Sequence, residues 1–148
     1  MTTIAMTLPV MRHSGIVLPR RDMVTAVGET VTIQISVKAS DDPTAAAVDL
    51  SPAGTFVRLL VWQPTTTLAY GWPYLPTQAA WAVDATILAG TGGRADVSVP
   101  AVARAGWPTR MAWMIELTMG ADVTSLASGV INAGSGGLLP DTYPQVIP

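Results

Sequence analysis

Strict alternation of apolar and polar residues predicts a β-strand between Val31 and Val37. The apolar positions are 31, 33, 35 and 37, and Thr32, Gln34 and Ser36 lie between them. A period of two places the two kinds of residue on opposite faces of a sheet. One face of this strand therefore packs on a core, and the other faces a different environment.

Five more stretches have the pattern of strands, and turn residues separate them. Asp41–Pro43, Ser51–Gly54 and Gly90–Gly93 are predicted turns, the last one a hairpin. About seven short strands at such spacing are typical of an all-β sandwich or barrel. Residues 55–64 are apolar on both faces, as in a central strand or one that a partner covers. The five stretches are residues 55–64, 79–90, 94–100, 109–120 and 123–132.

The two ends of the chain lack these patterns, and we expect each to form an extended arm around a sandwich of residues 23–131. Pro9, Gly15 and Pro19 interrupt residues 1–22, whereas residues 132–148 begin with a glycine-rich hinge and continue with spaced apolar residues. The second arm could equally fold back on its own domain. The predicted contacts to other subunits are Ile4, Met6, Leu8, Ile16 and Leu18 in the first arm and Leu138, Leu139, Tyr143, Val146 and Ile147 in the second.

The composition favours a subunit of an assembly. Hydrophobic residues make up 49% of the 148 residues and charged residues only 12%, whereas a typical soluble chain has about 25% charged residues. Burial against other subunits would cover the resulting apolar surface. No apolar stretch approaches the ~20 residues of a membrane span, and a net charge of −2 without a basic patch gives no support to nucleic-acid binding.

Residues with catalytic or metal-binding chemistry form no recognisable pattern. The chain has no cysteine, and its one histidine, His13, has no second ligand type nearby. Asp41, Asp42 and Asp49 match no calcium-loop spacing. No nucleophile elbow, phosphate loop or dinucleotide fingerprint is present. We therefore expect no enzymatic activity, cofactor, metal or small-molecule substrate.

Aromatic residues gather between residues 70 and 81. Tyr70, Trp72, Tyr74 and Trp81 are four of the nine aromatic residues. Exposed together, they could stack on sugar rings as a carbohydrate- or receptor-binding module does. Buried at an interface, they would contact another subunit, and the low charge of the chain favours this second interpretation.

Three short motifs occur in the order seen in one family. Gly28-Glu29-Thr30 begins a strand, Asp49-Leu50-Ser51 forms a turn, and Leu126–Ile131 forms a late strand. This order over residues 24–133 resembles the small immunoglobulin-like β-sandwich domain of tailed-bacteriophage virion proteins, such as the N-terminal domain of baseplate upper, head-fibre and adaptor proteins. Pro52 and Ala53, which separate Ser51 from Gly54, depart from the family pattern.

The resemblance implies a structural protein of the virion, assembled in the cytoplasm of a host bacterium. We expect it to bind other virion structural proteins and copies of itself, as a capsid decoration protein or as an adaptor in the neck or baseplate. The family usually carries this domain at the base of a longer fibre, and the two predicted arms are additional to it.

Overall fold

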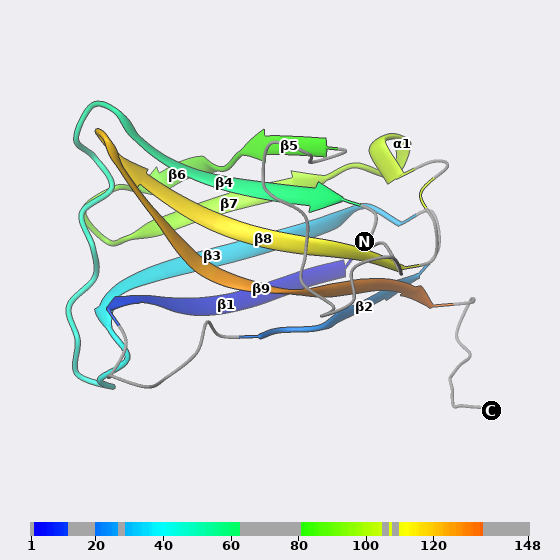
Figure 1. Cartoon of the computed structure of the whole chain (residues 1–148), viewed down its shortest axis with the longest axis horizontal. Helices are drawn as coiled ribbons and strands as arrows, with labels where there is room; N and C mark the ends of the chain where they lie inside the picture. The colour runs from blue at the N-terminus through cyan, green and yellow to red at the C-terminus, as the bar shows by residue number, and fades with distance from the viewer. Residues whose placement is uncertain are drawn as a thin grey trace, which may run out of the picture.

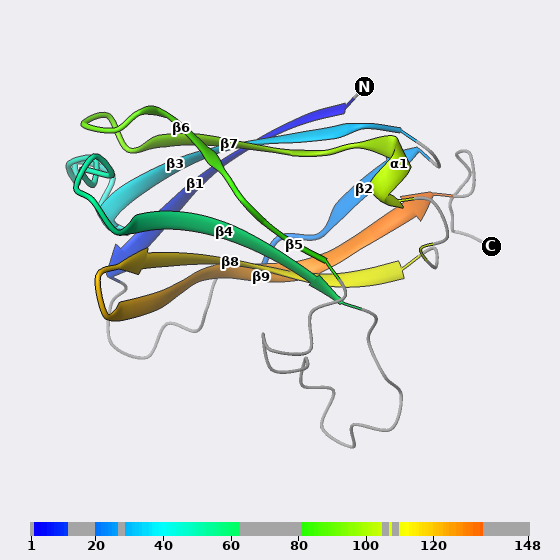
Figure 2. The ribbon, with the colours of Figure 1, turned by 90° about the horizontal axis from the view of Figure 1, so that it is seen from above.

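Two mixed β-sheets pack face to face in the computed structural model, which describes residues 2–11, 20–26, 29–62, 81–104, 107 and 110–134. Strands account for 69% of the described residues and helix for 4%. The predicted all-β sandwich is confirmed. Figure 2 shows the two layers edge-on, with one short helix, α1 (Ala101–Arg104), at one end. Among the described residues, no helix has the length and apolar character needed to span a membrane.

The first sheet, sheet A, has four strands in the order β1-β3-β7-β6. Its strands are β1 (Thr2–Met11), β3 (Val31–Ser40), β7 (Arg94–Val99) and β6 (Thr86–Ala89). The alternation that predicted β3 is confirmed, because Val31, Ile33, Ile35 and Val37 are each at most 1% exposed. They face the second sheet, and the polar residues between them lie on the outer face of sheet A.

Strand β1 corrects the prediction of an N-terminal arm. Thr2–Met11 pairs with β3 in parallel, from Thr2 opposite Val31 to Met11 opposite Ser40. Met6 and Leu8 fill the core of their own chain, at 4% and 0% exposure. Alternating apolar residues at positions 4, 6, 8 and 10 are a strand pattern, which the prolines and glycine of residues 1–22 obscured.

The second sheet, sheet B, has five strands in the order β2-β9-β8-β4-β5 (Figure 1). Its strands are β2 (Met23–Ala26), β9 (Asp122–Gly134), β8 (Arg110–Met119), β4 (Thr55–Trp62) and β5 (Trp81–Asp84). The predicted apolar stripe of β8 packs inward, since Met111, Trp113, Ile115 and Leu117 are all buried. β4 lies between β8 and β5, so the expectation of a central strand is confirmed. The described part of β9 ends at Gly134, three residues beyond the predicted sandwich boundary.

One continuous stretch serves both sheets. The sequence predicts a single strand over residues 79–90, but β5 pairs with β4 in sheet B and β6 pairs with β7 in sheet A. The change of sheet occurs at Ala85, whose amide donates a hydrogen bond of 2.7 Å to the Val57 carbonyl. This change of sheet connects the two layers along one side of the sandwich.

The glycine-rich turn between β6 and β7 is confirmed. Gly93 has φ +68°, a left-handed conformation that glycine adopts without strain. A Cβ atom there would lie 2.6 Å from the Val37 carbonyl oxygen. The turn therefore needs glycine both for its backbone conformation and for its close approach to β3.

Candidate interaction surfaces

The described residues contain no cluster of histidine, cysteine or carboxylate side chains that could hold a metal ion. On sheet B, Arg58 lies between two carboxylate residues, because it pairs with Asp84 on β5 and with Glu116 on β8. Asp84 accepts a hydrogen bond of 2.8 Å from Arg58 Nε on the outer face of sheet B, where both side chains are about half exposed. This hydrogen bond raises the pKa of Arg58, so the Asp84 carboxylate stabilises the protonated, charged form of the guanidinium.

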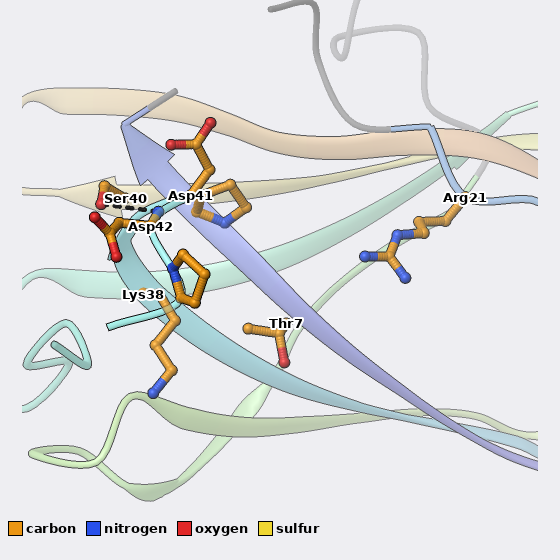
Figure 3. A pocket seen from close by; sticks show the side chains of 8 residues that line it. Thr7, Arg21, Lys38, Ser40, Asp41 and Asp42 are labelled. Atoms are coloured by element: carbon orange, nitrogen blue, oxygen red, sulfur yellow. Dashed lines mark hydrogen bonds between the residues drawn. The ribbon is translucent and has the colours of Figure 1, made fainter. Parts of the chain in front are cut away.

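A hollow of about 320 Å³ lies where the ends of β1 and β3 meet the turn after β3 (Figure 3). Asp42 Oδ1 accepts hydrogen bonds from the Thr44 amide and hydroxyl at 2.8 and 2.7 Å. That carboxylate closes a turn, and the Lys38 ammonium points away from it (Figure 3). The geometry indicates a surface depression next to a stabilised turn. Its lining residues are Thr7, Pro9, Arg21, Lys38, Ser40, Asp41, Asp42 and Pro43.

A polar network ties one end of the sandwich together. Arg104, only 7% exposed, donates hydrogen bonds of 2.5 Å from Nη1 to the Glu29 carbonyl and from Nη2 to Thr25 Oγ1. Burial lowers the pKa of Arg104, and the nearby Glu29 opposes that change. The Thr2 hydroxyl donates to the Glu29 carboxylate. These contacts join α1 to the ends of β1, β2 and β3, and their role is to fix this end of the fold.

An apolar cluster lies on the outer face of sheet B. Leu60 and Trp62 on β4 pair across the sheet with Met114 and Ala112 on β8. Leu60, Trp62 and Ala112 are buried and form a group separate from the main core. The Trp62 indole N–H has no hydrogen-bond partner among the described residues. Of the two apolar faces predicted for residues 55–64, the inner face of β4 is buried, whereas the outer face is buried at Leu60 and Trp62 and exposed at Phe56.

The aromatic residues that the sequence singles out are described only at Trp81. Its indole packs against the main core and meets Trp107 edge to face, with ring centroids 6.0 Å apart. Trp81 is therefore half-buried against the core of this domain. Tyr70, Trp72 and Tyr74 lie outside the described residues, so their role stays a prediction.

The residues expected to contact other subunits are placed only in part. Met6 and Leu8 belong to the chain's own core, and Ile4 is half-buried against it. For Met6 and Leu8 the predicted contact with a neighbour is wrong, because the facing sheet covers both. The remaining candidates lie outside the described residues, namely Ile16 and Leu18 near the N-terminus and Leu138, Leu139, Tyr143, Val146 and Ile147 near the C-terminus.

Sequence reasoning missed the outer positions of β1. Thr3, Ala5 and Thr7 are exposed on the outer face of sheet A, and β1 is an edge strand of that sheet. The sequence does show these three residues alternating with Ile4, Met6 and Leu8. Their position at an edge, however, depends on the pairing of β1 with β3, which residues 2–11 alone do not reveal.

Comparison with known proteins gives a similarity of fold. No family model matches the chain, and no curated protein matches it. Among solved structures, the chain is similar to the N-terminal domain of phage TP901-1 ORF48, with a TM-score of 0.52 and 8% sequence identity. The match covers 89% of this chain and 99% of that domain. The two share an architecture over nearly their whole length, and at this identity the likeness concerns the fold alone.

Proposed function

We propose that this chain is a non-enzymatic structural protein of a tailed-bacteriophage virion, acting as a capsid decoration protein or as a head–tail or baseplate adaptor. The observation that carries the proposal is the fold shared with a domain of a phage protein, which the match covers almost completely. The motif order over residues 24–133 independently resembles domains of tailed-phage virion proteins.

The composition supports the same proposal. The chain has 12% charged residues and 49% hydrophobic residues. Burial of apolar surface against other subunits would therefore stabilise an assembly of the chain. The partners would be other virion proteins and copies of the chain, brought together in the cytoplasm of the host bacterium. The apolar residues of 132–148 are proposed to contribute contacts as an arm.

The test is to locate the chain in purified virions of a phage that encodes it. Particles banded on a density gradient would be analysed by mass spectrometry and labelled with gold-conjugated antibody against the chain. Label over the whole head would indicate decoration, and label at the neck or tail tip would indicate an adaptor. Absence from banded particles, with the chain abundant in the lysate, would contradict the proposal.

The competing prediction is a carbohydrate- or receptor-binding module built on Tyr70, Trp72, Tyr74 and Trp81. The packing of the half-buried Trp81 against Trp107 and the core supports an internal contact for this residue over a place in an exposed aromatic platform. A screen of sugars by tryptophan fluorescence, with Trp72→Ala as control, separates the two functions. Saturable quenching that Trp72→Ala abolishes would favour the binding module.

A further inference from the structure

The outer edge of β1 carries backbone groups that point away from its only strand partner in the described chain. The Thr2 amide donates a hydrogen bond of 3.1 Å to the Thr30 carbonyl, and Thr2 lies opposite Val31. In a parallel ladder, every second residue makes the bonds to the neighbouring strand. Residues 2, 4, 6 and 8 therefore bond to β3, and the backbone N–H and C=O groups of Thr3, Ala5 and Thr7 face the open edge.

This edge lacks the charged residues with which edge strands avoid pairing with other chains. Thr2–Met11 contains no charged residue, and only Pro9 is unsuited to a further ladder. The opposite side of the sandwich differs, because the β5–β6 stretch connects the two sheets there. The edge strand of sheet B, β2, has only four residues and follows Arg20, Arg21 and Asp22.

The open stretch has a defined length. At its far end, the Met11 carbonyl accepts a hydrogen bond of 3.1 Å from the Asp41 amide, so the backbone turns inward there. Pro9 has no N–H to donate. As far as the described residues show, the groups available to a new strand are therefore those of Thr3, Ala5 and Thr7, which are spaced for one short ladder.

We propose that two copies of this chain pair antiparallel through β1, with a two-fold axis at Ala5. In this register Ala5 faces Ala5 of the second copy, Thr3 faces Thr7, and Pro9 lies beyond the ladder. A two-fold contact uses the same patch on both subunits, and this uncharged patch brings no like charges together. Threonine pairs across an antiparallel ladder are favourable. The two copies of sheet A would form one continuous eight-stranded sheet.

The pairing deepens the proposed structural role, on which it rests, because it names the surface through which copies join. The role and the pairing can fail separately. A chain found in virions but monomeric in solution and unpaired at β1 overturns the pairing alone. A β1-paired dimer that is absent from virions overturns the structural role alone.

The experiment is sedimentation velocity of the full chain, with variants that act only on the open edge. Ala5→Pro removes an N–H that faces away from β3, and Ala5→Lys places two like charges opposite each other on the axis. We expect the wild type to dimerise at concentrations up to roughly 100 μM, and each variant to raise the dissociation constant by more than about tenfold. Ser98→Lys is the control, since it adds the same charge at an exposed site of sheet A on the interior strand β7.

A second readout identifies the edge itself, even if one variant folds poorly. Amide hydrogen exchange by NMR would show Ile4, Met6 and Leu8 protected at every concentration, because β3 bonds them. Thr3, Ala5 and Thr7 would gain protection as the concentration rises. The proposal is overturned if the wild type stays monomeric over this range, or if it dimerises without protection at these three amides.

Discussion

The backbone carbonyl of Arg21 lies directly against Gly129 of β9. A Cβ atom at position 129 would be 1.9 Å from that oxygen and 3.1 Å from the Trp113 indole nitrogen. The approach is held by the Arg21 amide, which donates to the Ser128 carbonyl at 2.9 Å, and by the Val130 amide, which donates to Asp22 Oδ1 at 3.0 Å. This contact joins residues 20–22 to β9 before β2 begins, and only glycine leaves room for it.

Gly129→Ala is therefore expected to destabilise the fold by about 3 kcal/mol, because the carbonyl it meets is backbone and cannot rotate away. Chemical denaturation followed by circular dichroism measures the loss. Gly92→Ala is the matched control, since a Cβ there meets Ala89 at an ordinary 3.5 Å. Equal stability of the two variants would show that residues 20–22 do not lie against β9 at this distance.

Arg104→Met is expected to reduce the free energy of unfolding by about 1–3 kcal/mol. Methionine can occupy the site of the arginine stem but leaves the Glu29 carbonyl and the Thr25 hydroxyl without their donor. The comparison is Arg94→Met, which removes an exposed arginine from β7 and should change stability by less than about 0.5 kcal/mol. Similar losses in both variants would argue against the buried network.

The Asp49 carboxylate is expected to titrate below its ordinary value of 3.8. Ser51 lowers the pKa of Asp49 by donating from its hydroxyl at 2.6 Å and from its amide at 2.9 Å. The stabilisation is complete above pH 3.8 and is lost as the pH falls through the lower, folded-state pKa. An NMR titration of the carboxyl carbon measures the midpoint. Ser51→Ala should raise it, and Ser98→Ala should leave it unchanged.

Trp81→Ala is expected to destabilise the chain by about 2 kcal/mol, because the substitution removes both the packing of the indole on the core and its contact with Trp107. Phe56→Ala is the aromatic control, because Phe56 is 45% exposed on the outer face of sheet B and should cost less. Thermal unfolding compares the two. Retention of wild-type stability by Trp81→Ala would return Trp81 to the candidates for an exposed binding platform.

Local patterns predicted the elements whose inner faces are strongly apolar. The strict alternation of β3 and the stripe of β8 encode their burial directly, and the hairpin at Gly93 follows from its glycines. β1 was missed because its partner lies about 30 residues along the chain and its pairing is parallel, which leaves no turn signal between the strands. The change of sheet at Ala85 depends on the Val57 carbonyl, and no residue within 79–90 indicates it.

The sequence predicts that copies of the chain associate, but for Met6 and Leu8 of β1 the predicted contact with a neighbouring subunit is wrong. The prediction chose Met6 and Leu8 because they are apolar. Both are buried in the core, and the alternation of the strand therefore places Thr3, Ala5 and Thr7 on the outer face of sheet A. Whether the odd- or the even-numbered residues of β1 bond to β3 decides which backbone groups point to the outer edge. This alternation exists only in the assembled sheet, so the composition of the chain could not indicate it.

The pairing of Met23 with Ile131 has a consequence for synthesis on the ribosome. The only strand partner of β2 in the described chain, β9, emerges more than a hundred residues after β2, and β9 is also one of the two neighbours of β8. Sheet B therefore cannot be completed until β9 has been synthesised. Such distant pairing makes folding slow, and β2 stays without its strand partner while the strands between them in the sequence are synthesised.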